Sequence, residues 1–156
     1  TIHTNDAASS ITRLVDMGVE PFLVGSSLVA ALAQRLVRLL CVECREAYEA
    51  TDDQLAEIGI TRGDADGHQL YRPKGCTACK HTGYRGRIGI FEMMLVDDEI
   101  RAMVSKNVDS KTIKQQAVSN GMGTIRQDGA RKVLDGVTSI AEVLRATEEE
   151  GTVAQI

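Results

Sequence analysis

The residues best suited to chemistry are four cysteines arranged in two pairs. Cys41 and Cys44 form one C-x2-C pair, Cys76 and Cys79 form the other, and 31 residues separate the pairs. A C-x2-C turn places both sulfurs on one side of the backbone, so two such turns can supply the four thiolates of a tetrahedral zinc site. Four protein ligands leave no position for water, which favours a structural role over a catalytic one. We therefore predict a structural zinc ion bound by all four cysteines.

Two alternatives use the same part of the chain. The cysteines could instead form two disulfides or a redox pair, and His68 or His81 could replace one sulfur as a metal ligand. The sequence shows no export signal, so we expect a cytoplasmic protein, in which thiols stay reduced. Neither histidine is needed when four cysteines are present, and exposed loop positions would explain both.

The sequence His3-Thr4-Asn5-Asp6 is a second candidate site. We expect it where a strand ends and a helix begins, which is where ligands gather in open α/β sheets. A simple N-cap turn explains the same residues. The chain contains no Gly-Lys dipeptide and hence no G-x4-G-K-S/T loop for nucleotide phosphates. We expect a fragment that begins inside a strand and is not a self-sufficient P-loop enzyme.

Charge is distributed unevenly around the cysteines. Residues 43–66 carry eight acidic and two basic side chains, whereas residues 67–91 carry five basic side chains and no acid. The basic block could compensate the negative charge that four thiolates leave on a zinc site, or contact nucleotide phosphates or anionic lipid headgroups. Nucleic acid is disfavoured, because the whole chain has a net charge of −4 and only 3% aromatic residues. The basic side chains are Arg72, Lys74, Lys80, Arg85 and Arg87.

Two helices are expected before the first cysteine. The first runs from a cap at Asn5 to Gly18, which suits a left-handed C-terminal position. The second begins at Pro21, and its apolar residues continue around most of the helix circumference as far as Leu39. A helix that is apolar on several sides needs burial, so we expect a sheet from preceding residues to cover it.

One short helix is expected between the cysteine pairs. Thr51 and Gln54 form a capping box, Gly59 ends the helix, and residues 63–67 form a polar loop. This segment has few apolar residues with which to stabilise itself, chiefly Leu55, Ile58, Ile60 and Leu70. Without the metal ion, the lobe should therefore unfold.

A strand and several helices are expected after the second pair. The run from Arg87 to Val96 predicts a strand buried on both faces, interrupted only by Glu92. Helix starts and ends follow at Asp97 or Asp98, at Asp109 to Gly121, at Thr124 to Gly136, and at a Ser139/Glu142 capping box. From Glu148 the sequence reads as a frayed acidic tail.

The composition is that of a globular chain. Among its 156 residues, 43% are hydrophobic and 26% charged, which excludes disorder for most of the length. The longest apolar stretch, residues 21–33, is too short to span a bilayer.

These motifs occur in an order that characterises one family. The chain resembles, over residues 1 to about 150, the C-terminal part of the secretion ATPases of the type II secretion and type IV pilus-assembly family. The run Met17-Gly-Val-Glu-Pro-Phe22 and the acidic end are more similar to the type II branch. The matching segments are Ile2–Ala7, Thr12–Phe22, Leu32–Arg38, Gly75–Ile90 and Gly136–Thr147.

The resemblance implies an α/β fold in four parts. Residues 1–40 would be the C-terminal remnant of a RecA-like domain, 41–80 a four-cysteine metal-binding lobe, 81–147 a strand with a terminal helical subdomain, and 148–156 a tail. The parent protein would be a cytoplasmic, hexameric, Mg-dependent ATPase, docked on inner-membrane platform proteins, that drives pseudopilus assembly. The alternatives are the pilus-assembly branch and a zinc-stabilised interaction module that hydrolyses nothing.

The resemblance also assigns roles to individual residues. His3 matches the histidine of the family's His box, which senses the γ-phosphate or positions catalytic groups, and the four cysteines match its metal-binding subdomain. Arg87 matches an arginine near the nucleotide base, although a solvated strand-edge residue explains it as well. The elements that bind ATP and Mg would lie upstream of Thr1, so we expect no activity from this fragment alone.

Overall fold

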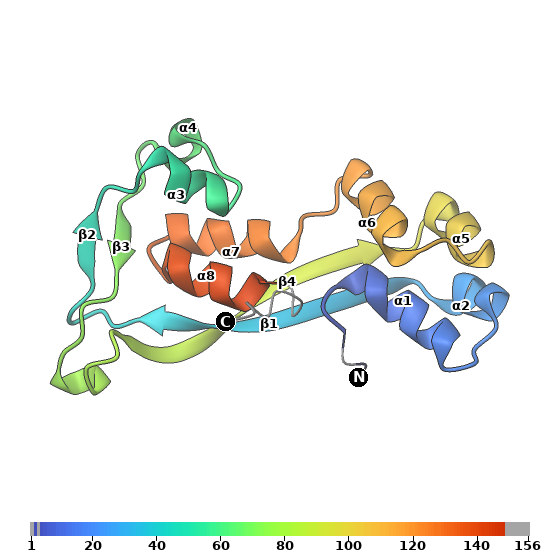
Figure 1. The fold of residues 1–156 in the computed structure, drawn as a ribbon, viewed down its shortest axis with the longest axis horizontal. Helices are drawn as coiled ribbons and strands as arrows, with labels where there is room; N and C mark the ends of the chain where they lie inside the picture. Colours follow the sequence, from blue (N-terminus) through green and yellow to red (C-terminus); the bar gives the residue numbers. More distant parts are fainter. Residues whose placement is uncertain (1, 3, 149–156) are drawn as a thin grey trace, which may run out of the picture. The chain divides into compact units, whose positions relative to one another are not determined.

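The computed structural model describes residue 2 and residues 4–148 as short helices with two two-stranded sheets (Figure 1). The chain divides into two compact units. The helical unit combines the residues up to Gln34 with Phe91–Ile125, and the cysteine unit combines Arg35–Ile90 with the residues from Arg126 onward. Strands β1 (Ala30–Leu40) and β4 (Tyr84–Leu95) pair with each other, and each contributes residues to both units. The structure is therefore a mixture of helix and sheet, as predicted.

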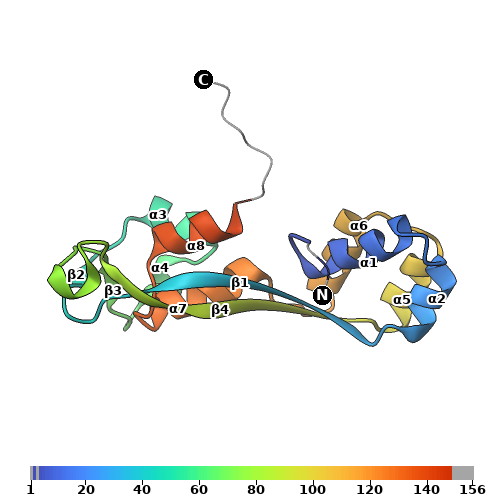
Figure 2. The ribbon, with the colours of Figure 1, turned by 90° about the horizontal axis from the view of Figure 1, so that it is seen from below.

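The helical unit contains four helices around an apolar core. These are α1 (Ala7–Asp16), α2 (Pro21–Ser27), α5 (Asp98–Ser105) and α6 (Ser110–Ser119). Helix α1 packs against α6, and α2 packs against α5 (Figures 1 and 2). The largest side chains that they bury fully are Ile11, Met94, Ile100 and Ile113.

Aspartates begin three of these helices. The side chains of Asp97 and Asp109 accept hydrogen bonds from the backbone N–H groups of Ile100 and Thr112, which confirms both predicted helix starts. At α1 the predicted cap is wrong by one residue. The cap is Asp6 instead of Asn5, and its carboxylate accepts from the N–H of Ser9 at 2.8 Å. Gly18 follows α1 at φ +91°, as expected of a helix end.

The predicted helix from Pro21 to Leu39 is wrong. Helix α2 ends at Ser27, and Ala30–Leu40 form strand β1. Leu32 and Leu36 are exposed, whereas Ala31 and Val37 are buried. Strand β1 forms its backbone hydrogen bonds with β4, which is distant in the sequence. The apolar residues of this segment fit both the helical period and the strand period, so their pattern could not identify that partner.

The predicted strand after the second cysteine pair is present as β4, but it is not buried on both faces. In the part of β4 that belongs to the helical unit, Phe91, Met93 and Leu95 are exposed. Glu92, expected to be the interruption, is 1% exposed and lies on the buried side with Met94. The strand therefore follows the period-2 alternation of a sheet with one covered face.

The cysteine unit combines a small sheet with four helices and one 3-10 turn. Strands β2 (Glu46–Tyr48) and β3 (Leu70–Arg72) pair antiparallel, with Ala47 opposite Tyr71. The 3-10 turn η1 (Thr77–Cys79) carries part of the second cysteine pair. The helices are α3 (Asp52–Glu57), α4 (Arg62–Ala65), α7 (Ile125–Leu134) and α8 (Ile140–Thr147).

Several predicted helix boundaries in this unit are confirmed. Thr51 and Gln54 form a reciprocal capping box on α3, and the Ser139 hydroxyl accepts from the N–H of Glu142 at the start of α8. Gly136 follows α7 at φ +68°. The predicted polar loop at residues 63–67 is partly wrong, because Thr61 caps the one-turn helix α4 within it.

The segment between the cysteine pairs does not stabilise itself alone. Leu55, Ile58 and Leu70 are buried in a cluster with residues of α7 and α8, namely Ala130, Val133, Ile140 and Val143. This agrees with the expectation that its own apolar residues are too few, and helices from the C-terminal part of the sequence complete the core. The four cysteines form a separate buried cluster, to which no other described side chain belongs.

No helix among the described residues has the length and hydropathy needed to cross a bilayer.

Candidate metal centre

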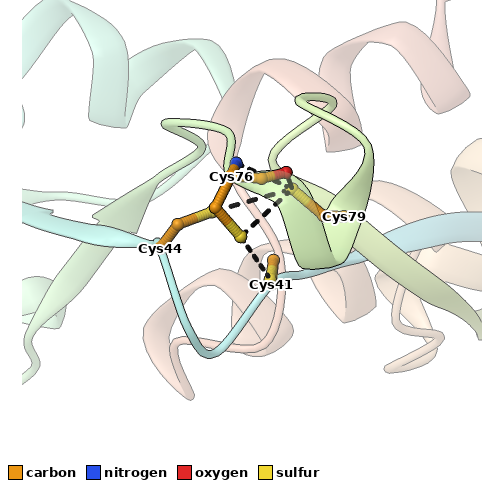
Figure 3. A group of neighbouring side chains, drawn as sticks. All are labelled: Cys41, Cys44, Cys76 and Cys79. Atoms are coloured by element: carbon orange, nitrogen blue, oxygen red, sulfur yellow. Dashed lines mark hydrogen bonds between the residues drawn. The ribbon is translucent and has the colours of Figure 1, made fainter.

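The structure brings all four cysteines together. Their Sγ atoms lie within 4.8 Å of one another, although they come from two segments far apart in the sequence (Figure 3). Cys41, Cys44 and Cys79 are buried, and Cys76 is partly buried. The Sγ of Cys41 is 3.9 Å from that of Cys76, and the Sγ of Cys44 is 3.8 Å from that of Cys79.

These separations fit a tetrahedral metal site. Four sulfurs at about 2.3 Å from a central zinc ion would lie about 3.8 Å from one another. A disulfide requires about 2.05 Å between sulfurs, and all four cysteines are free thiols here. The four sulfur donors and their separations therefore match a site for one metal ion bound by four thiolates, and they do not match two disulfides.

Local backbone geometry shapes the two cysteine turns. The N–H groups of Cys44 and Arg45 both donate to the carbonyl of Cys41, which closes the first turn. The second turn ends in left-handed backbone at Lys80 and His81, with φ of 53° and 62°. Gly83, at φ +76°, lies so close to Pro73 that a Cβ there would collide with the proline ring. The second turn is thus closed by a contact between Gly83 and Pro73 that only glycine permits.

Backbone N–H groups are directed at the sulfurs. Gly75 donates to the Sγ of Cys44 at 3.3 Å, and Cys76 and Gly83 each donate to the Sγ of Cys79 at 3.2 Å. Burial raises the pKa of the Cys44 thiol to about 12. Burial also acts to raise the pKa of Cys79, but the two N–H donors outweigh it and lower that pKa to about 6. N–H donors of this kind favour the thiolate form that a metal ion requires.

Neither alternative histidine belongs to the cluster of metal-type side chains. His68 is exposed, and its Nδ1 lies 3.1 Å from the carbonyl oxygen of Leu134. His81 is exposed in the left-handed turn that follows Cys79. The four sulfurs are thus the complete set of clustered donors among the described residues.

The basic block pairs mainly with the acidic segment beside it. Arg72 and Lys74 both contact Glu46, at 3.3 and 2.6 Å, and Arg85 lies 3.7 Å from Glu43. These basic side chains therefore compensate carboxylates of the acidic segment 43–66. All of these side chains are well exposed, so each pair adds little to stability.

Of the two predicted nucleotide-site residues, the structure describes only Arg87. Arg87 lies in β4 with an exposed side chain, and no ion pair involves it among residues 4–148. His3 lies outside the described residues. The turn that follows it is described: the Thr4 hydroxyl donates to the carbonyl of Asp6 at 3.1 Å.

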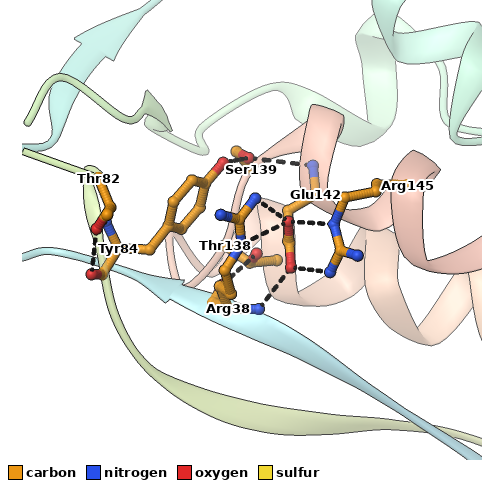
Figure 4. Close-up of polar contacts among 7 residues, drawn as sticks. All are labelled: Arg38, Thr82, Tyr84, Thr138, Ser139, Glu142 and Arg145. Atoms are coloured by element: carbon orange, nitrogen blue, oxygen red, sulfur yellow. Dashed lines mark hydrogen bonds and ion pairs between the residues drawn. The ribbon is translucent and has the colours of Figure 1, made fainter.

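Sequence analysis missed a second cluster of charged side chains in the cysteine unit. Glu142 is 1% exposed, and its carboxylate accepts from the backbone N–H and the guanidinium of Arg38 and from the guanidinium of Arg145 (Figure 4). The guanidinium of Arg38 also stacks over the ring of Tyr84, whose hydroxyl is 2.7 Å from that of Ser139. This network connects the start of α8 to β1 and β4.

The charge state of Glu142 follows from these contacts. Burial acts to raise its pKa, but the two guanidinium groups and the N–H of Arg38 lower it to about 2. The capping box was the signal available in the sequence, since it placed Glu142 in the first turn of a helix. The box gave no indication that a distant arginine would neutralise the carboxylate.

The mixed fold and the four-sulfur centre agree with one class of protein. The chain belongs to the type II/IV secretion system protein family, whose model matches residues 1–145. Among curated proteins, it is 47% identical over 150 residues to the type II secretion system protein E of Pseudomonas aeruginosa. It is 44% identical over 149 residues to the type II secretion system ATPase E of Vibrio cholerae, and 44% identical over 149 residues to the type IV pilus assembly ATPase PilB of Thermus thermophilus.

Each of these matches covers 96% of this chain, but the relatives are much longer. The chain spans 29% of the two type II proteins and 17% of the pilus ATPase. Both branches of the family are thus represented among its relatives at similar identity.

Proposed function

We propose that this chain is the C-terminal part of a hexameric secretion ATPase that couples ATP hydrolysis to pseudopilus assembly and protein export by type II secretion. The observation that carries the proposal is the family match over residues 1–145, which includes both cysteine pairs of the four-sulfur centre. The names of relatives such as the ATPase E of Vibrio cholerae support the ATPase activity of the whole protein.

In this proposal the chain supplies the end of a RecA-like domain (residues 1–40), the metal-binding lobe (41–80) and a terminal helical subdomain (81–147). The loops that bind ATP and Mg belong to the longer protein, in agreement with the absence of a Gly-Lys dipeptide here. His3 responds to the γ-phosphate, and Arg87 lies near the nucleotide base. These two roles rest on the resemblance of the motifs.

The metal that we propose for the four cysteines is zinc, in a structural role. Sulfur separations of 3.8–3.9 Å and backbone N–H groups directed at the sulfurs support this assignment. When bound, the ion cross-links two turns that have no apolar core of their own. Because four sulfurs complete a tetrahedral shell, the ion would activate no water.

The proposed partners follow from the family. The whole protein forms a ring of identical subunits and docks on platform proteins at the cytoplasmic side of the inner membrane. Exposed basic side chains such as Lys80 offer a contact to anionic lipid at that surface. No nucleic-acid partner is proposed.

Substitution of His3 tests the proposed activity. In the full-length protein, we expect His3→Ala to lower the kcat of ATP hydrolysis by roughly tenfold or more, because catalysis depends on groups positioned at the phosphates. The affinity for nucleotide should change little. Steady-state hydrolysis together with nucleotide titration measures both quantities, and an unchanged kcat would contradict the role of His3. His81→Ala, at an exposed histidine, is the matched control.

Genetic complementation separates the two branches of the family. The full-length gene should restore protein export to a strain that lacks its type II secretion ATPase. Restoration of pili alone, in a strain that lacks its pilus-assembly ATPase, would instead assign the protein to the pilus branch.

A further inference from the structure

Glu92 is a buried carboxylate in the helical unit that the proposed site does not use. Its side chain has no exposed surface, and it extends from β4 into the covered side of that strand. The Oε1 atom accepts the N–H of Ala7 at 3.1 Å, and Oε2 accepts the N–H of Ile125 at 3.2 Å. One carboxylate therefore binds two backbone groups that are far apart in the sequence.

Both N–H groups belong to the first residue of a helix. Ala7 begins α1 and Ile125 begins α7. The first N–H groups of a helix have no partner inside the helix, and the helix dipole places partial positive charge there. Glu92 thus satisfies one unpaired donor at each helix start, each with a different carboxylate oxygen. An isosteric glutamine could accept only one of the two, because its NH2 group would face the other donor.

Lys114 provides a second connection to the same helix start. This residue of α6 places its Nζ 3.5 Å from Oε2 of Glu92 and 2.9 Å from Oδ2 of Asp6. Asp6 is the N-cap of α1. The first turn of α1 is therefore held to β4 directly, through Ala7, and indirectly, through Asp6 and Lys114.

We propose that Glu92 is a positioning residue that fixes the turn from Thr4 to Ala7 for nucleotide hydrolysis. This inference rests on the proposed function, in which the residue that precedes the turn, His3, responds to the γ-phosphate. In this account Glu92 contacts no nucleotide and holds the turn that follows His3 in the sequence. Displacement of a catalytic group by a fraction of an ångström lowers the rate without a matching loss of binding.

A double-mutant cycle in the full-length protein tests the proposal. We expect Glu92→Gln to lower kcat roughly tenfold while KM for ATP changes less than about twofold. Combined with His3→Ala, it should lower kcat no further, because Glu92 acts through the turn that follows His3. Lys114→Gln, which keeps Glu92 and breaks the connection to Asp6, should give a smaller loss of kcat that is also absent in the His3→Ala background.

Glu142→Gln is the matched control, since Glu142 is an equally buried carboxylate in the cysteine unit. Any loss of kcat that it causes should be the same with and without His3→Ala. If Glu92→Gln does not fold, the cycle with Lys114→Gln decides the question alone.

The possible failures can be told apart. If His3→Ala leaves kcat unchanged, the proposed role of His3 and the positioning role of Glu92 are both overturned. A second case is that His3→Ala lowers kcat, but the folded Glu92 and Lys114 variants do not behave as expected. If they leave kcat unchanged, or lower it equally in the wild-type and the His3→Ala protein, only the positioning role is overturned.

Discussion

The two units of this chain are stabilised in different ways. The helical unit has a continuous apolar core that includes Ile11, Ile100 and Ile113, and it holds one buried carboxylate at the start of two helices. The cysteine unit has an apolar cluster to which α3, α7 and α8 contribute. Among the described residues, the cysteines form a buried cluster of their own. From this comparison we expect the proposed metal ion to stabilise one local region and not the whole chain.

The largest expected effect is that of metal removal on the cysteine turns. Structural zinc contributes on the order of 10 kcal/mol in small domains, so its removal by a chelator, or Cys44→Ser, should open residues 41–44 and 76–83. Hydrogen exchange resolved by peptide should show this loss of protection, while α5 and α6 stay protected. Elemental analysis of protein purified without added metal should give one zinc per chain.

Val42→Ala is the matched control for Cys44→Ser, because Val42 lies in the same turn with a side chain 77% exposed. It should keep the metal and the protection. Protein that is metal-free and equally protected would contradict the zinc assignment.

A smaller effect, in the other unit, is expected from a cavity in the helical core. Ile100 has no exposed surface, so Ile100→Ala should lower the free energy of unfolding by about 2–5 kcal/mol. Urea denaturation measures this loss, and metal content should stay at the wild-type value. Met93→Ala, at a side chain 56% exposed, should cost far less. If Ile100→Ala releases the metal, the two units are not stabilised independently.

The smallest of these effects depends on pH and concerns Glu142. Its pKa falls from 4.5 to about 2 in the folded chain, so the stabilisation is fully present above about pH 4.5 and is lost as the pH falls towards 2. The shift corresponds to at most about 3 kcal/mol. We expect Glu142→Gln to be destabilising at pH 6 and much less destabilising at pH 2.5.

Urea denaturation of both proteins at each pH measures this difference. Subtracting the two free energies at one pH removes the cysteine contribution that both proteins share. A destabilisation of equal size at pH 6 and pH 2.5 would show that the charge of Glu142 does not matter.

The parts of the fold that the sequence predicts correctly are those set by neighbouring residues. The caps at Thr51, Asp97 and Asp109 depend on contacts within one helical turn, and the cysteine pairs carry their spacing in the sequence itself. Strand β1 could not be predicted in this way, because its partner β4 follows more than 40 residues later.

The missed site residues were missed for the same reason. Glu92 was visible as a lone acid in an apolar run, but its partners Ala7 and Ile125 lie 85 and 33 residues away. The partner of Glu142 at Arg38 is 104 residues distant. A buried charge is stabilised by groups that folding brings to it, and its own neighbours in sequence do not identify them.

The division of the chain into units has a practical consequence for dissecting the protein. Each unit is assembled from two stretches of sequence that alternate with those of the other, with crossings after Gln34, Ile90 and Ile125. A simple truncation therefore cannot deliver either unit by itself, since any fragment that contains the whole of one unit also contains part of the other. Isolating one unit would require joining its two stretches with a designed linker that replaces the intervening residues of the other unit.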